Sequence, residues 1–116
     1  MKKESTAGTL IENSVWGYTV YNIFTKANHY RWWNIYSEIK YWYLAYGKCT
    51  YMIEIKWKNV SHNLEQGDTF CIHAWIPNIF YFHEDSLLIE SFPHTAKKEK
   101  YLAYQTIKKN KISIID

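Results

Sequence analysis

The sequence lacks the segments that mark several large classes of protein. It contains no charge-free stretch of about 18 apolar residues, the length that a membrane-spanning helix needs. Its basic start leads into no apolar run of the kind that signal peptides have. We therefore expect a cytoplasmic protein without a membrane span. A glycine-rich phosphate loop, a Gly-x-Ser-x-Gly nucleophile turn and a DNA-reading helix pattern are also missing, so nothing favours the enzymes and DNA-binding proteins that use them.

Cysteine, glycine and proline are scarce, with 2 Cys, 4 Gly and 2 Pro in 116 residues. Cys49 and Cys71 form neither a CxxC motif nor a dense pattern. This favours buried free thiols in a reducing compartment, with a disulfide as the weaker alternative. A charged fraction of 22% beside 47% hydrophobic residues is typical of a single folded domain and excludes a disordered chain.

Aromatic side chains are the component that the chain has in excess. The 6 Trp, 11 Tyr and 5 Phe make up 19% of the residues. A small core does not need so many rings, so we expect some to line a ligand cavity or a subunit interface. Residues 30–46 are apolar on both strand faces, as in a strand that is covered on both sides, and this predicts a homodimer.

The basic charge is concentrated near the C-terminus. The net charge is +3, and residues 97–111 contain Lys97, Lys98, Lys100, Lys108, Lys109 and Lys111. The rest of the chain is nearly neutral. Such a run most often forms a solvated surface. Binding of single-stranded nucleic acid by lysines and exposed rings is a weaker alternative.

Short alternating segments separated by turn residues predict an all-β fold. Between Cys49 and Trp57 apolar and polar residues alternate with period two, the pattern of a half-buried strand. Further strands are expected at 14–24, at two places within 30–46, and at 60–64, 69–73, 79–82 and 86–92. About seven or eight short antiparallel strands predict a sandwich or a barrel.

The same pattern suggests how the chain is divided. We expect an N-terminal arm over residues 1–13, a β-barrel over 14–94 and a basic C-terminal segment over 95–116. The last segment is predicted to be short and irregular or helical. For residues 95–109 the alternation permits a helix or a strand.

One segment resembles the second signature motif of the cupin superfamily. That motif has Gly, Pro, Gly, His and Asn at fixed spacing, and in the same frame this sequence has Gly67, His73, Trp75, Asn78 and Phe82. The spacing holds while four of the five residue types differ. Residues 40–51 resemble the end of the first cupin signature, and residues 15–18 are similar to the Trp-Gly opening of cupins that handle sugar phosphates. The resemblance covers roughly residues 14–92 and implies a cupin barrel, that is, an antiparallel double-stranded β-helix or jelly roll.

The resemblance also indicates where a metal would bind. Metal-binding cupins use two His and one Glu from the first signature and one His from the second. The Glu position here is Lys40, the His positions of the first signature are Asn34 and Tyr36 (Trp33 and Ile35 with the longer spacing), and the last is Asn78. These positions supply no imidazole or carboxylate, and a lysine charge opposes a cation. We therefore expect no metal and no other cofactor at the usual site.

The histidines leave one alternative open. The five His show no HxH or HxxxH spacing and are expected to be solvated or hydrogen-bonded. A displaced metal site built from His29, His73 and Glu38 stays possible on the sequence alone.

Metal-independent relatives isomerise or epimerise sugars by moving protons beside a carbonyl. We expect His73 to be the preferred proton carrier, Tyr36 an acid, and Lys40 a base or carbonyl clamp, because a buried amine has a lowered pKa. Tyr36 and Lys40 share strand parity with two of the expected substrate-binding residues, which are Asn34, Trp42, Trp75 and Asn78. The expected function is that of a sugar isomerase or epimerase acting on a keto-sugar or sugar nucleotide. The alternative is a non-catalytic cupin that binds a sugar or an anion and has lost its metal site.

Overall fold

The computed structural model describes residues 2–5, 7–33 and 35–99. In this part of the chain it contains strands and no helix, and thus no helix that could cross a membrane. The strands are β1 (Lys2–Ser5), β2 (Gly8–Val15), β3 (Tyr18–Thr25), β4 (His29–Trp33), β5 (Ile35–Tyr36), β6 (Lys40–Tyr46), β7 (Lys48–Ile55), β8 (Lys58–Glu65), β9 (Thr69–Ile72), β10 (Asn78–Phe82), β11 (Ser86–Pro93) and β12 (Lys98–Glu99).

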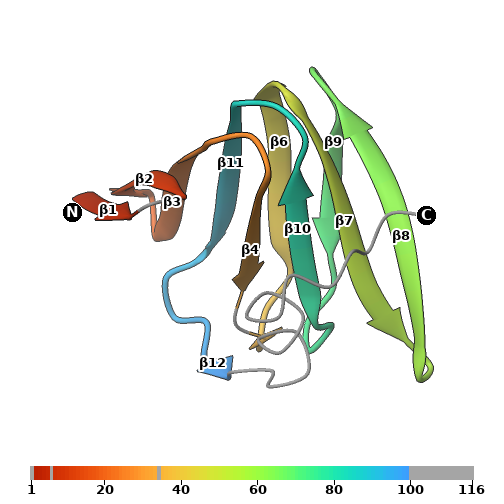
Figure 1. The fold of residues 1–116 in the computed structure, drawn as a ribbon. Coiled ribbons are helices and arrows are strands. Elements are labelled where there is room, and N and C mark those ends of the chain that lie inside the picture. The colour runs from red at the N-terminus through yellow and green to blue at the C-terminus, as the bar shows by residue number, and fades with distance from the viewer. Residues whose placement is uncertain (1, 6, 34, 100–116) are drawn as a thin grey trace.

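The strands form two large sheets that face each other (Figure 1). The first sheet has the order β1-β2-β3-β11-β6-β9 and the second has the order β4-β10-β7-β8, with β12 and β5 as a separate pair. Every recorded strand pair is antiparallel. The inner rings meet across the sheets, as Trp42 and Phe80 show with centroids 4.8 Å apart. The all-β, antiparallel sandwich or barrel predicted from the alternation is therefore confirmed.

One end of the interior is mainly apolar. Ile23, Leu88 and Leu44 are neighbours across β3, β11 and β6, and Phe82 pairs with Cys49 across β10 and β7. All of these side chains are at most 1% exposed. This apolar end lies near the β6–β7 turn, at the top of Figure 1. Its burial supplies hydrophobic stabilisation.

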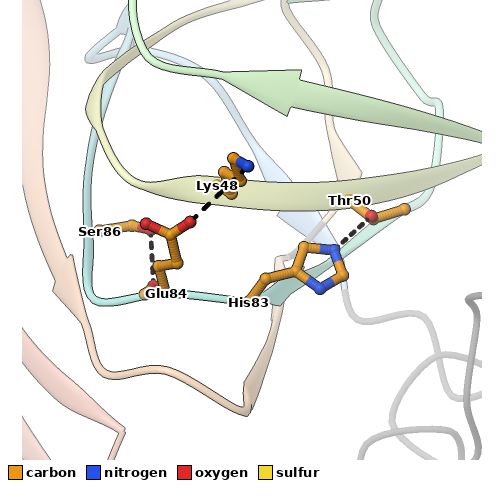
Figure 2. Close-up of polar contacts among 5 residues, drawn as sticks. All are labelled: Lys48, Thr50, His83, Glu84 and Ser86. Carbon is orange, nitrogen blue, oxygen red and sulfur yellow. Dashed lines mark hydrogen bonds and ion pairs between the residues drawn. The ribbon is translucent and has the colours of Figure 1, made fainter.

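Polar contacts that include buried Thr50 and Ser86 close the same end (Figure 2). Thr50 Oγ1 lies 2.7 Å from His83 Nε2, and Ser86 Oγ donates a hydrogen bond to the carbonyl of Glu84 at 2.8 Å. Lys48 Nζ is 4.0 Å from Glu84 Oε2, and both side chains are more than half exposed. An exposed ion pair of this kind contributes little to stability. These contacts connect β7 with the start of β11 and serve the fold.

Tight hairpin turns explain two differences from the expected strands. Trp16-Gly17 joins β2 to β3, and Lys56-Trp57 joins β7 to β8, with positive φ at all four residues. Positive φ at both central residues is the geometry of the turns that match strand twist. The segment 14–24 is therefore the end of one strand and most of the next. The alternation of β7 ends before Trp57, which is 94% exposed.

The predicted division of the chain needs correction at its start. Residues expected to form an arm contain β1 and most of β2, which belong to the first sheet. Ala7 lies between these strands and is 7% exposed, so it is part of the core. At the other end, β12 pairs with β5. The remainder of the C-terminal segment, and with it most of the helix-or-strand alternative for 95–109, lies outside the described residues.

Candidate functional site

A lysine side chain is buried inside the barrel at the end opposite the apolar one. Lys40 begins β6 and is 1% exposed. Its Nζ lies 4.4 Å from the centroid of the Tyr36 ring and 5.2 Å from that of Trp42. Loss of hydration lowers the pKa of this amine to about 8, although the negative charge of Glu90 acts in the opposite direction. Near neutral pH a useful fraction of Lys40 is therefore an uncharged amine.

The strand parity predicted for this segment is confirmed. Tyr36, Lys40 and Trp42 are 4%, 1% and 2% exposed, whereas the intervening Tyr41 is 47% exposed. Alternate residues of a strand point to opposite faces, so β6 buries one face only. Within one chain β6 is covered on one face only, and the cover of its other face by a second copy stays a prediction. Asn34, the fourth residue assigned to the inner face, lies outside the described residues.

A glutamate that the sequence analysis did not select accompanies Lys40. Glu90 on β11 pairs with Trp42 on β6 and with Tyr21 on β3. Its side chain is 0% exposed. Burying a carboxylate is costly unless a charge or donor compensates it. Lys40 is close enough for the two charges to affect each other. One feature of the sequence could have pointed to Glu90. It is a single carboxylate between Leu88 and Phe92 on the apolar face of an alternating strand.

Two tyrosines connect this cluster with a half-buried carboxylate. Burial, the hydrogen bond with Glu12 and the charges of Glu12 and Glu90 raise the pKa of Tyr21 to about 12. Burial first, and then Glu90, raises the pKa of Tyr36 above its ordinary value. Their hydrogen bond lowers the pKa of Tyr21 and raises that of Tyr36, so Tyr36 donates to Tyr21. The hydroxyls thus form a chain from Tyr36 through Tyr21 to Glu12.

Asn78 faces the same part of the interior from the second sheet. It begins β10, is 0% exposed, and donates through Nδ2 to the carbonyl of Ile76 at 3.4 Å. Among the described residues its Oδ1 has no hydrogen-bond partner. Strands β6 and β10 run in the same direction (Figure 1), and Lys40 precedes Trp42 by the same two residues as Asn78 precedes Phe80. Because the rings of Trp42 and Phe80 meet, Lys40 and Asn78 begin their strands on the same side of this ring contact.

These side chains define what we call the Lys40 cluster: Tyr21, Tyr36, Lys40, Trp42, Asn78 and Glu90. Each is at most 8% exposed. The cluster combines an amine, a carboxylate, two phenols, an amide and a flat indole at one end of a barrel. Such groups can hold a polar molecule and move protons on it.

His73 and Trp75 lie outside the cluster. His73 follows β9 and is exposed, because its neighbour Ile72 takes the inward position and is 2% exposed. Trp75 is 55% exposed, and its backbone N–H donates to the Tyr36 carbonyl at 2.8 Å. The structure therefore brings Tyr36, Lys40, Trp42 and Asn78 together and places His73 and Trp75 in a loop outside them. The alternation of inward and outward residues along β9 could have shown that His73, unlike Tyr36, Lys40 and Trp42, does not face the interior.

The donor chemistry of the cluster does not fit a resident metal. Its one carboxylate, Glu90, is accompanied by the amine of Lys40, and no imidazole is present among the described members. Elsewhere in the described ranges, no group of three or more His, Cys, Asp or Glu gathers. His29 pairs with Phe82 at the apolar end, whereas His73 follows β9, whose last residue pairs with Lys40. These two histidines therefore do not share a displaced site.

The other cysteine and histidine expectations have mixed outcomes. Both cysteines are free thiols, with Cys49 buried and Cys71 exposed, so the expectation that both are buried is wrong for Cys71. His29 Nδ1 lies 2.9 Å from the Ala27 carbonyl, and His94 Nδ1 contacts the Gly17 carbonyl. With the contact of His83, these agree with hydrogen-bonded histidines in structural roles.

Comparisons with known proteins identify the fold. No family model and no curated protein matches the sequence. A Bacillus subtilis oxalate decarboxylase structure, described for its Mn(II) centers, has a TM-score of 0.78 at 16% identity over 95% of this chain and 34% of its own. A mutant of that enzyme gives 0.74 at 14% identity over 100% and 37%. The formate complex of Lactobacillus farciminis oxalate decarboxylase gives 0.71 at 11% identity over 87% and 31%.

This chain thus spans about a third of the length of these enzymes. At such low identity the likeness concerns the fold and carries no activity with it. The described part of the chain has the cupin fold, an antiparallel double-stranded β-helix.

Proposed function

We propose that the protein is a metal-independent cupin that isomerises or epimerises a small carbonyl-bearing carbohydrate, such as a keto-sugar or a sugar nucleotide. The observation that supports this proposal is the buried amine of Lys40, which occupies the inner wall of a cupin barrel together with Tyr36, Asn78 and Glu90. A desolvated amine with a pKa of about 8 is a suitable general base near neutral pH.

The reaction begins with proton abstraction. Neutral Lys40 takes a proton from the carbon next to the carbonyl, and the electron pair moves to the carbonyl oxygen. Glu90 stabilises the ammonium that forms, because its charge favours the protonated state of Lys40. Lys40 then returns the proton to the neighbouring carbon in an isomerase. In an epimerase the intermediate first turns its other face toward Lys40, which then returns the proton to the same carbon.

Tyr36 moves the second proton. It gives its hydroxyl proton to the developing enolate oxygen and takes a proton back from the enediol oxygen that becomes the new carbonyl. Asn78 orients a substrate hydroxyl through its buried amide oxygen, and Trp42 presents a flat face to the sugar ring.

This mechanism changes one role that we expected from the sequence. His73 is exposed and lies outside the cluster, so Lys40 replaces it as the proton carrier. Tyr36 keeps its role as acid. Trp75 lies beside the cluster through its backbone contact with Tyr36 and does not form a wall of the interior.

Solvent-deuterium exchange tests the proposal. A panel of keto-sugars and keto-sugar nucleotides is incubated with protein in deuterated water. We expect deuterium at the carbon next to the carbonyl, and a loss of at least about 100-fold in Lys40→Met, the usual effect of removing a general base. His73→Ala is the matched control and should retain full exchange. No exchange across the panel, or full exchange in Lys40→Met, contradicts the proposal.

A non-catalytic binding protein is the second candidate. The near-complete burial of the Lys40 cluster favours it, since a closed interior suits retention of a ligand better than turnover. The Lys40 ammonium would anchor an anion or a sugar hydroxyl. A thermal shift with a sugar, a sugar phosphate or a small acid that depends on Lys40, without deuterium exchange, would support this candidate over the enzyme.

A further inference from the structure

We propose that Lys40 acts as a nucleophile and forms an imine with the carbonyl carbon of a small hydroxy-aldehyde or hydroxy-ketone. This inference rests on the proposed function and adds a covalent step to it, after which Glu90 takes over from Lys40 as the base. It defines the ligand class by a reactive carbonyl and assigns Lys40 as the atom that binds it.

The surroundings of Lys40 suit the cation that this step produces. Nζ lies between the ring faces of Tyr36 and Trp42, at 4.4 and 5.2 Å from their centroids. These faces attract a cation. An iminium ion carries its positive charge at the same nitrogen as the original ammonium. The rings and the charge of Glu90 therefore stabilise the product with the contacts that are already in place.

Burial distinguishes Lys40 from the other lysines. Among the lysines whose side chains the structure describes, it is buried and the rest are exposed. A desolvated lysine in an apolar setting is a better nucleophile than a hydrated one, because more of it is uncharged. Loss of water also favours imine formation, which releases a water molecule.

The step balances with the groups present. Glu90 takes a proton from the Lys40 ammonium, and the freed Nζ lone pair attacks the carbonyl carbon. Tyr36 gives a proton to the carbonyl oxygen and takes one back from the nitrogen. Glu90 then gives its proton to the hydroxyl, which leaves as water while the C=N bond forms. One ammonium and one carbonyl thus give one iminium ion and one water. No oxidant or reductant is required.

Access to Lys40 occurs at the polar end of the barrel. Two described segments lie against Tyr36 there. One is β12, which pairs with β5. The other is the loop 73–77, held by the Trp75 N–H to Tyr36 carbonyl bond at 2.8 Å and the Glu54 N–H to Pro77 carbonyl bond at 3.3 Å. Because Lys40 is 1% exposed, a carbonyl compound enters only when this end opens. A three-carbon compound demands the smallest opening, so dihydroxyacetone is the probe of choice.

Reductive trapping tests the covalent step. The full chain is incubated with dihydroxyacetone and cyanoborohydride near pH 7.5, and modified lysines are located by peptide mass spectrometry. We expect Lys40 to be modified at least tenfold faster than Lys48, which is exposed, and Glu90→Gln to slow the Lys40 adduct alone. Modification of Lys40 no faster than that of Lys48 overturns the proposal.

Oxygen exchange provides a readout that needs no reductant in the barrel. Imine formation and hydrolysis replace the ketone oxygen with oxygen from water, so wild-type protein should incorporate ¹⁸O from labelled water into dihydroxyacetone. Lys40→Arg, which keeps the charge, should reduce the rate to that without protein. Equal rates for wild type and Lys40→Arg overturn the proposal.

The covalent step and the proposed function fail separately. Deuterium exchange without trapping or ¹⁸O exchange at Lys40 leaves the isomerase standing and removes the imine. Trapping and ¹⁸O exchange without deuterium exchange on any sugar confirm the imine and contradict the isomerase.

Discussion

Burying a lysine and a glutamate almost completely costs a small barrel folding free energy. Lys40 and Glu90 are 1% and 0% exposed. Apolar residues of similar size in such positions often stabilise a protein more than an ion pair does. The two side chains lie at the barrel end where Tyr36 and Asn78 also converge. At the scale of the residue, this arrangement is the strongest argument for a chemical role.

Removing one member of the pair should destabilise the folded protein, because the other member then stays buried without it. We expect Lys40→Met to lower the free energy of unfolding by about 3 kcal/mol near pH 7, because Glu90 then remains as a buried charge. The double variant Lys40→Met/Glu90→Gln should recover most of this loss. Lys48→Met, at an exposed lysine, is the control and should change stability by less than about 0.5 kcal/mol. Urea unfolding followed by fluorescence measures all four proteins, and additive losses in the double variant would contradict the coupling.

The pKa of Lys40 also predicts a pH dependence of stability. Its value of about 8 in the folded protein lies below the ordinary 10.5, so between these values the unfolded chain binds the extra proton. Stability must therefore increase as pH rises through this window. Burial raises the pKa of Cys49 from 9 to about 12, which opposes the trend above pH 9. We expect wild type to gain about 1 kcal/mol between pH 8 and pH 9 relative to the double variant. A constant difference would contradict the depressed pKa.

The sequence predicted part of this cluster. Strand parity placed Tyr36, Lys40 and Trp42 together, because alternation within one strand is a local property. Glu90 and Tyr21 were missed because their proximity depends on the registers of β11 with β6 and β3, which no single segment encodes.

At the scale of the element, turns determine which strands meet. Gly47 and Gly67 both have positive φ, at 98° and 93°. A Cβ at Gly47 would clash with the Ser86 side chain and approach the Asp85 carbonyl, whereas a Cβ at Gly67 would meet nothing within 4 Å. Ser86 is 1% exposed and donates to the Glu84 carbonyl, so it cannot easily move.

This contrast predicts different costs for the same substitution. Gly67→Ala should lower the free energy of unfolding by about 1 kcal/mol, the cost of holding a residue with a Cβ at positive φ. Gly47→Ala should lose about 2 kcal/mol more, because it also overpacks the β6–β7 turn. Chemical denaturation of the two variants measures the difference. Equal losses would show that the turn accommodates a side chain.

Most strands were predictable because their alternation is local, as in β11. The hairpin turns at Trp16-Gly17 and Lys56-Trp57 were not, since tryptophan and lysine are uncommon where φ is positive. The same limitation explains why β2 was assigned to an arm. Its residues show little alternation of burial, and its place in the sheet depends on pairing with β3.

At the scale of the whole molecule, the homodimer and the cytoplasmic location stay predictions. The outer face of β11, β6 and β9 contains a groove of about 440 Å³, lined by Tyr41, Tyr43, Cys71 and Ile89 among others. β9 is the edge strand of this sheet. The groove therefore borders backbone N–H and C=O groups with which a strand of a second copy of the chain can pair, extending the sheet. We therefore place the predicted dimer contact on this face.

Light scattering tests the dimer. The wild-type protein at micromolar concentration should have twice the mass of one chain, and Tyr43→Glu, at a side chain that is 41% exposed, should have the mass of one. The exposed Trp57→Glu on the β7–β8 turn is the control and should leave the dimer intact. A monomeric wild type would contradict the prediction.

The central claim is that a poised amine occupies the part of this cupin barrel where the resemblance puts a metal ligand. The most direct measurement is an NMR titration of the Lys40 side chain, with ¹³C at Cε and the signal assigned by its loss in Lys40→Arg. We predict a midpoint near pH 8. The midpoint should move to lower pH in Glu90→Gln, because the neighbouring negative charge that raises the pKa of Lys40 is then removed. A midpoint at the ordinary 10.5, unaffected by Glu90→Gln, would contradict the account.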